Sequence, residues 1–431
     1  MNEPAAHRKT LLIVLFWLLL AAGCTGLQPV GGTPAPVSTP TASLTPPPAP
    51  QTTNTPSGPK ILKLWLPPQF DPELDAPASQ ILKSRLEEFS ARRPDVRVEV
   101  RIKAQQGAGG LLDSLTTANA AAPLALHDLI AMPRQILEIA ALKGLLRPFD
   151  EVSETIDQPD WYEFARELAR LQDSTFGLPF AGDTLILVYR STLLSQPPAD
   201  LNGLLDTIGP LAFPAADPQA LTTLALYQAA GGVIQDAEGR PTLQASPLTE
   251  IFTFYRQAAS SALAPFWLTQ YQSDEQAWEA FLGNQAEMVI TWTSRYLNNL
   301  QADFAAAPLP TPNGNRYTLA TGWVWVLATT NPDHRVLSAQ LAEFLSESDF
   351  LARWTAALGY LPPRADAMSA WGVASQRTFF SQVAESAHVY PSEDILTILG
   401  PPLEQAAVQV LKLESEAAEA AQAAIQSLGG P

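Results

Sequence analysis

Residues 60–103 read KILKLWLPPQFDPELDAPASQILKSRLEEFSARRPDVRVEVRIK, and this stretch decides the fold class. Its first part, residues 61–66, is a short apolar run closed by two prolines, which predicts a strand. Apolar residues then recur at helical spacing from residue 82 to residue 89. From residue 96 to residue 103 apolar and charged residues alternate, which is typical of a strand with one solvated face. The stretch therefore predicts a β-α-β unit.

The same alternation of strands and helices continues towards the C-terminus. Further strands are predicted at residues 129–132, 185–189, 288–291 and 323–327, and helices at 136–140, 221–230, 248–262 and 275–282. Such a pattern indicates an α/β protein whose largely parallel sheet is covered by helices on both faces. About 370 residues follow the N-terminal region, more than the roughly 250–300 that one core supports, so we expect at least two compact units.

The first 24 residues have the features of an export signal. A short basic flank precedes the apolar run LLIVLFWLLL at residues 11–20, which is shorter than the ~20 residues that span a bilayer. Ala21, Ala22 and Gly23 then precede Cys24, the only cysteine of the chain, and this arrangement resembles a bacterial lipobox, although a leucine is usual at the position of Ala21. Residues 1–24 are therefore predicted to be a lipoprotein signal peptide, with lipid attached to Cys24. Ordinary signal-peptide cleavage that leaves a free thiol is the alternative.

Residues 25–59 are rich in proline, threonine and serine, which favours a disordered tether. The whole chain carries a formal net charge of −17. This charge argues against nucleic acid as a partner, because phosphate binding needs clustered lysine and arginine. A single cysteine also excludes a disulfide within the chain.

Several short segments, taken in order, carry a resemblance to a known family. They are RLEEFSARRPDVRVEV (residues 85–100), LHDLIAM (126–132), GLLRPFD (144–150), GLPFAGDTLILVYRSTLL (177–194), FLGNQAEMVITW (281–292), APLPTPNG (307–314) and GYLPPR (359–364). The ordered set resembles the carbohydrate-type extracellular solute-binding proteins of ATP-binding-cassette importers. His127-Asp128 replaces the usual Pro-Asp, and Ser191-Thr192 stands where a Lys-Asp pair is common.

The resemblance implies a periplasmic-binding-protein fold of type II, with two α/β lobes and a ligand cleft between them. It implies three crossings between the lobes, near residues 179–186, 293–300 and 320–325. Lobe one would then comprise residues 60–179 and 300–320, and lobe two residues 180–299 and 321–431. Closure of the hinge would follow from the higher affinity of the ligand for the closed form.

A sugar offers apolar C–H faces to aromatic rings and a rim of hydroxyls to polar groups. On this basis the candidate ligand-binding residues are Trp65, Gln69, Asp71, Asp183, Trp292, Arg295, Trp323 and Tyr360. Core packing is the alternative for the aromatic residues, a local turn for Asp71 and Asp183, and a surface ion pair for Arg295. Trp325 shares a strand face with Trp323, and we expect it in the core.

We expect no enzymatic activity, cofactor or metal, because the common nucleophile, P-loop and metal motifs are missing and the four histidines are scattered. A secreted glycoside hydrolase, which needs only two carboxylates, stays open as an alternative, as does a tethered sensor that acts on a membrane kinase. The resemblance implies a monomer that is anchored through Cys24 to the outer face of the cytoplasmic membrane. There it would deliver a mono- or oligosaccharide to the permease subunits of an importer.

Overall fold

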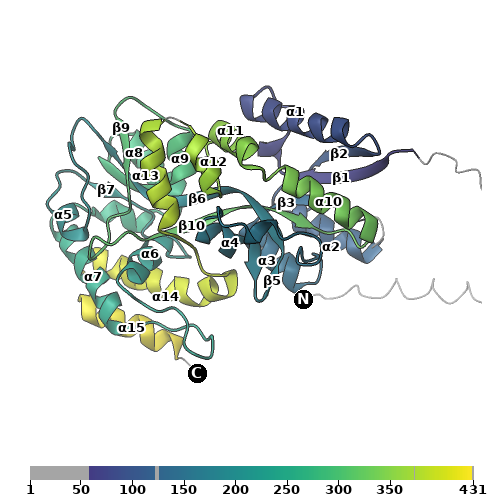
Figure 1. The fold of residues 1–431 in the computed structure, drawn as a ribbon. Coiled ribbons are helices and arrows are strands. Elements are labelled where there is room, and N and C mark those ends of the chain that lie inside the picture. The colour runs from purple at the N-terminus through teal and green to yellow at the C-terminus, as the bar shows by residue number, and fades with distance from the viewer. Residues whose placement is uncertain (1–57, 122–125, 373, 430–431) are drawn as a thin grey trace, which may run out of the picture. The chain divides into compact units, whose positions relative to one another are not determined.

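The computed structural model describes residues 58–121, 126–372 and 374–429 (Figure 1). The predicted signal peptide, Cys24 and nearly all of the tether lie outside the described residues. The strands are β1 (Lys60–Leu66), β2 (Val96–Ile102), β3 (Leu129–Pro133), β4 (Arg170–Leu171), β5 (Ser174–Thr175), β6 (Gly177–Arg190), β7 (Leu211–Ala212), β8 (Met288–Trp292), β9 (Phe304–Ala307), β10 (Thr318–Leu327) and β11 (Ala387–Val389).

Helices account for most of the remaining described chain. The α-helices are α1 (Pro77–Arg92), α2 (Leu111–Ala121), α3 (Arg134–Leu142), α4 (Glu163–Ala169), α5 (Leu201–Leu205), α6 (Leu221–Ala229), α7 (Ala245–Ser260), α8 (Asp274–Leu282), α9 (Thr293–Leu297), α10 (Pro332–Phe344), α11 (Ser348–Leu358), α12 (Ala365–Ala370), α13 (Ala374–Glu385), α14 (Glu393–Leu411) and α15 (Ala417–Leu428). Short 3-10 helices are η1 (Pro68–Phe70), η3 (Thr155–Asp157) and η4 (Phe266–Gln270). Among the described residues, none of the helices is both long enough and apolar enough to span a membrane.

The β-α-β unit predicted from residues 60–103 is confirmed. Strands β1 and β2 pair in parallel along their whole length, from Lys60 opposite Val96 to Leu66 opposite Ile102. Helix α1 connects them and buries the apolar residues that recur at helical spacing. On the other side of β1, β3 also pairs in parallel. These strands therefore end at the same edge of the sheet.

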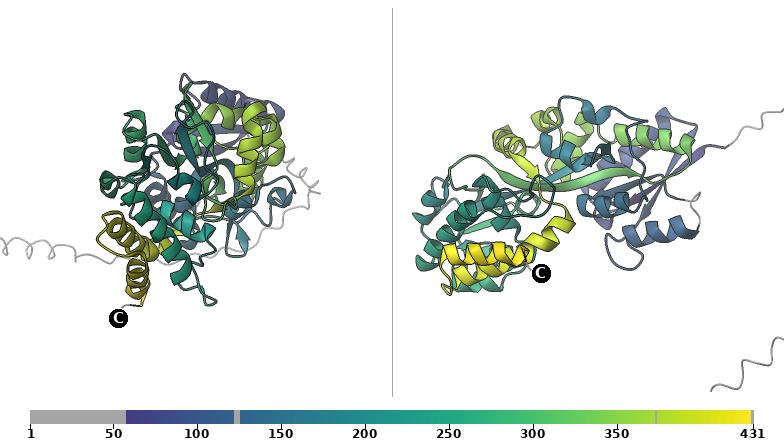
Figure 2. Two further views of the ribbon diagram at one scale, coloured as in Figure 1. Left: turned by 90° about the vertical axis from the view of Figure 1, so that its left-hand side faces the viewer. Right: turned by 90° about the horizontal axis from the view of Figure 1, so that it is seen from below.

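Two long strands join the two halves of the sheet. From Gly177 to Thr184, β6 pairs with β10, which lies between β6 and β3. From residue Leu185 onward β6 pairs instead with β8, and from Leu187 also with β9. The right-hand view of Figure 2 shows the light-green β10 running from one group of helices to the other. The expectation of two α/β lobes is confirmed.

Close packing of α4 explains two glycines on these long strands. A Cβ on Gly182 of β6 would lie 2.7 Å from the ring of Phe164, and a Cβ on Gly322 of β10 would lie 2.7 Å from Leu168. Both contacts are shorter than van der Waals packing permits. Helix α4 can therefore lie directly on the strands where the lobes join.

The lobe boundaries and the number of crossings stay predictions, but three observations bear on them. Strand β9, within residues 300–320, pairs with the part of β6 that also pairs with β8. Helices α10 and α11, within residues 321–431, pack against β1, β3 and α1. Helix α9, at the crossing predicted near residues 293–300, packs on β6 and β8.

Candidate functional site

The strands of both lobes end at the place where β6 changes partner. The last residue of β3, Pro133, lies opposite Trp323 of β10, which in turn lies opposite Ala181 of β6. The last residue of β8, Trp292, lies opposite Leu185 of β6. Ligands of α/β proteins bind beyond the carboxyl ends of strands. We call residues 181–185 of β6, with their partners on β10, the junction.

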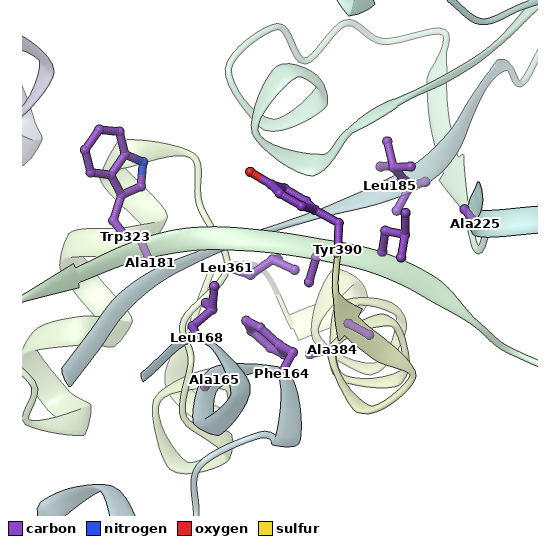
Figure 3. Packing of buried hydrophobic residues seen from close by; sticks show 14 of the residues in the cluster. Phe164, Ala165, Leu168, Ala181, Leu185, Ala225, Trp323, Leu361, Ala384 and Tyr390 are labelled. Carbon is purple, nitrogen blue, oxygen red and sulfur yellow. The ribbon is translucent and has the colours of Figure 1, made fainter. Parts of the chain in front are cut away.

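Trp323 and Tyr360 are joined by a side-chain hydrogen bond at the junction. Trp323 is 7% exposed, and its indole N–H donates a hydrogen bond to the Tyr360 hydroxyl, since an indole nitrogen can only donate. Burial, together with the negative charge of nearby Asp183, raises the pKa of Tyr360 to about 12. Figure 3 shows Trp323 and Tyr390 on one side of β10, with Phe164 of α4 on the other.

Asp183 is buried, and its carboxylate accepts hydrogen bonds from the first two residues of α9. One oxygen, Oδ1, accepts hydrogen bonds from the Thr293 hydroxyl at 2.7 Å and from the Ser294 backbone N–H at 2.9 Å. The other, Oδ2, accepts from the Ser294 hydroxyl at 2.5 Å. Desolvation raises the pKa of Asp183 to about 6, although the three hydrogen bonds oppose this shift. A carboxylate with about four acceptor positions thus has one left for another donor.

Trp292 and Arg295 lie on either side of this contact. Trp292 is half-buried, and its ring meets that of Tyr390 edge-on, with 6.4 Å between ring centroids. Arg295 forms ion pairs with Asp274 at 2.5 Å and with Glu275 at 2.6 Å. Its guanidinium is therefore already engaged by two carboxylates of α8.

The three candidates near the end of β1 have different environments. Trp65 is 2% exposed, and its ring lies 4.0 Å from that of His127. Gln69 is exposed on η1. Asp71 is half-buried and accepts a hydrogen bond from the Glu73 backbone N–H at 2.9 Å, as a turn residue would. The structure thus brings Asp183, Trp292, Arg295, Trp323 and Tyr360 together. It places Trp65 on β1, Gln69 on η1 and Asp71 directly after η1. The ligand-binding role of all eight stays a prediction.

A cavity of about 670 Å³ lies between elements of the two lobes. Its walls come from the loop after β2, from α2 and α3, and from the segments that precede α6 and begin α14. They are Gln105, Gln106, Gly107, Gly110, Leu112, Asp113, Thr116, Gln135, Ile136, Ile139, Lys143, Gln219 and Glu393. This lining is rich in amide side chains, which both donate and accept hydrogen bonds.

Sequence reasoning missed this amide-rich lining and two aromatic residues of the junction. Phe70 meets the ring of Trp323 edge-on, with 4.9 Å between centroids. Tyr390 is 8% exposed, forms a hydrogen bond with the Thr321 side chain, and has a pKa that burial raises to about 12. Phe70 could have been found because it lies only four residues after a predicted strand. Tyr390 could not, because about 60 residues separate it from β10.

The described residues contain no group of three or more histidine, cysteine, aspartate or glutamate side chains that could hold a metal ion. Two histidines contact a carboxylate: His334 contacts Asp128 at 2.9 Å, and His388 contacts Glu167 at 3.5 Å.

Comparison with known proteins identifies relatives of this chain. A family model described as bacterial extracellular solute-binding protein matches residues 84–378. The maltotriose-binding protein of Pyrococcus abyssi (strain GE5 / Orsay) is 25% identical over 241 residues, which are 54% of this chain and 51% of that protein. The chain therefore matches about half the length of this curated relative.

Solved structures share the fold. The cyclic alpha-maltosyl-1,6-maltose binding protein from Arthrobacter globiformis is 17% identical and aligns with a TM-score of 0.70, covering 86% of this chain and 98% of that one. The sugar-binding protein MalE from Xanthomonas citri is 19% identical, with a TM-score of 0.69 and the same coverage of both chains. At these identities the likeness shows the two-lobe fold.

Proposed function

This chain belongs to the bacterial extracellular solute-binding proteins, and from that premise we propose that it binds a carbohydrate between its two lobes. The ligand is a mono- or oligosaccharide, and the protein delivers it to the permease subunits of an ATP-binding-cassette importer. Binding requires no chemical step, so the protein acts without a cofactor and without enzymatic turnover.

The observation that carries this proposal is the cavity of about 670 Å³ that has walls from both lobes. A ligand in this position contacts Gln135 of one lobe and Gln219 of the other at the same time. It can therefore bind the closed form more tightly than the open form, which is the condition for ligand-driven closure. The amide groups match sugar hydroxyls, which also donate and accept hydrogen bonds.

Aromatic residues that lie outside the cavity lining support a carbohydrate rather than a more uniformly polar ligand. Trp292, Trp323 and Tyr360 lie at the junction, where the strands of both lobes end. Aromatic rings bind the apolar faces of sugars, and an opening of the lobes would expose them further. The relatives named above are described as binding proteins for maltotriose and other sugars, which supports the same ligand class.

Retention at the membrane is the second part of the proposal. Export follows from the family, and we propose that Cys24 carries the lipid that holds the protein on the outer face of the cytoplasmic membrane. Two acyl chains anchor a protein far better than one. A Cys24→Ser variant, expressed in a bacterial host, is expected to appear in the soluble exported fraction. Unchanged membrane association of this variant would contradict the anchor and leave the ligand proposal intact.

Titration calorimetry of the purified protein tests the ligand. Maltose, maltotriose and maltotetraose form one panel, and xylose, galactose and a tripeptide form the other. We expect a saccharide to bind with micromolar or tighter affinity and to raise the melting temperature without release of reducing sugar. Release of reducing sugar would identify a hydrolase, and binding of the tripeptide alone would exclude a saccharide receptor.

A further inference from the structure

Asp183 lies where β6 leaves one lobe and enters the other. Up to Thr184, β6 pairs with β10, and from residue Leu185 it pairs with β8. The backbone N–H of Thr184 also donates to the Thr293 hydroxyl at 3.1 Å. The start of α9 is therefore bonded to two successive residues of β6 at the point where this strand changes partner.

The three hydrogen bonds to the Asp183 carboxylate involve only Thr293 and Ser294, the first two residues of α9. Trp292 directly precedes them and ends β8. A buried charge is stable only when hydrogen bonds replace its hydration, so α9 and the carboxylate depend on each other. Displacement of the start of α9 would therefore displace Trp292.

We propose that Asp183 is a positioning residue, which holds the start of α9 against β6 and so fixes the orientation of Trp292 for the ligand. This inference rests on the proposed saccharide binding. It differs from the sequence-based prediction, in which the Asp183 carboxylate itself contacts the sugar. Its three donors leave too few free acceptor positions for the two ligand hydroxyls that this prediction assigned to it.

The charged and titratable groups that face Asp183 come from two other elements. Tyr360, before α12, lies close enough for the carboxylate to raise the pKa of its hydroxyl. Asp274 at the start of α8 raises the pKa of Asp183, and Arg295 forms an ion pair with Asp274. The negative charges of Asp183, Asp274 and Glu275 therefore share this region with one arginine, Arg295.

A double-mutant cycle separates positioning from direct contact. Asp183→Ala, Trp292→Ala and the double variant are titrated with the saccharide that the wild type binds best. We expect each single variant to bind about tenfold or more weakly, because each loses the correctly oriented Trp292 ring, and the double variant to be within about twofold of the weaker single variant. If the affinity of the double variant falls by about the product of the two single-variant factors, the proposal is overturned, because the free-energy effects of independent contacts add.

The matched control is Asp200→Ala. Asp200 accepts a hydrogen bond from the Gly203 backbone N–H at 2.7 Å and so caps α5, which like α9 has five residues. This variant is expected to retain saccharide affinity within about twofold. An equal loss of affinity in Asp200→Ala would show a general effect of cap removal and would contradict the inference.

Hydrogen exchange of the ligand-free protein provides a readout that does not depend on saccharide binding. In Asp183→Ala we expect amides of residues 293–297 to exchange about tenfold faster or more, while those of residues 201–205 keep the wild-type rate. If Asp183→Ala does not fold, Thr293→Val and Ser294→Ala each remove one hydroxyl donor and are measured in its place.

Unchanged exchange at residues 293–297 overturns the inference even if saccharide binds. Faster exchange supports the inference that Asp183 positions α9, whether or not a saccharide binds. Failure of every saccharide in the panel to bind would count only against the proposed function.

Discussion

Trp323 and Trp325 lie two residues apart on the same face of β10, yet their surroundings differ. Trp325 is fully buried, and its ring stacks on Phe180 with 4.3 Å between centroids. Its indole nitrogen has no hydrogen-bond partner within the part of the chain that the structure describes. Trp323 lies at the junction, and its indole N–H is bonded to Tyr360. The position along one strand therefore decides whether a tryptophan acts only as an apolar core residue or also uses its polar atom.

The same contrast extends to the neighbours of these two residues. Around Trp325, an aromatic core contains Phe180, Trp354 and Phe350, all in ring contact through Trp354. The junction instead surrounds an ionisable group, Asp183, with hydroxyl donors. We expect substitutions in the aromatic core to change stability, and substitutions at the junction to change how stability depends on pH and how ligand binds.

The largest effect is expected in the aromatic core. Trp354 is fully buried, so Trp354→Ala should lower the free energy of unfolding by about 3–5 kcal/mol, through lost apolar burial and the cavity that is left. Urea unfolding measures this loss. Trp267→Ala, at a half-buried tryptophan of η4, is the control and should cost less. Equal losses of unfolding free energy in the two variants would contradict the distinction between the core and its periphery.

At the junction, the pKa of Asp183 predicts a pH dependence. Burial raises this pKa to about 6, so the folded protein holds the proton more tightly than the unfolded chain. The resulting stabilisation is complete below about pH 4 and is lost as the pH rises through 6. Between pH 4 and pH 7 the wild type should therefore lose up to about 3 kcal/mol of unfolding free energy relative to Asp183→Asn, which has no carboxyl group to titrate at this position. Urea unfolding at both pH values checks this, and a constant difference would contradict it.

Gly322→Ala tests the contact between α4 and β10. The new Cβ would lie 2.3 Å from the carbonyl oxygen of Ala181 and 2.7 Å from Leu168, so one of the two strands or the helix must move. We expect a loss of about 1–3 kcal/mol in unfolding free energy, as for other overpacked sites. In Gly58→Ala the Cβ would meet nothing within 4 Å, and this control should leave stability unchanged. A stable Gly322→Ala variant would mean that α4 does not lie against the strands.

The smallest effect is expected for Tyr360→Phe, which removes the acceptor of the Trp323 indole N–H and little apolar surface. Loss of one hydrogen bond should cost about 0.5–1.5 kcal/mol. Thermal unfolding measures it, with Tyr271→Phe as control, whose hydroxyl makes a longer, exposed hydrogen bond to Gln285 at 3.4 Å. If Tyr360→Phe costs no more than the control, the Trp323–Tyr360 pair is not a stabilising contact.

Local patterns predicted most of the elements of the fold. The expectation of a largely parallel sheet is wrong, because β10 pairs antiparallel with β3 and β6, and β6 pairs antiparallel with β8 and β9. The β-α-β unit from residue 60 and the strand at residues 288–291 were recognised from the spacing of apolar residues, which reflects only the chain within each element. The full length of β6 was not predicted. The pattern indicated residues 185–189, whereas the strand begins at Gly177, because the glycines and proline of its first half are poor strand formers that pairing with β10 holds in place.

The candidate site was only partly accessible from sequence. Trp292 and Trp323 were recognisable as aromatic residues at strand ends. The partners of Asp183 were not, because Thr293 and Ser294 are 110 and 111 positions away along the chain. Likewise, Gln219 and Glu393 border one cavity with Gln135 only because the two lobes face each other.

The amino-acid sequence by itself determined the α/β class, the predicted export signal and tether, and the supply of aromatic and amide side chains. These follow from composition and from spacing within single elements, which need no knowledge of distant contacts. The sequence also predicted Trp325 for the core. Only the tertiary structure decided that the Trp323 indole N–H is hydrogen-bonded to Tyr360 and that the Asp183 carboxylate is hydrogen-bonded to the start of α9. Burial and hydrogen-bond partners are properties of surfaces that long-range strand pairing brings together, so no local pattern of residues can specify them.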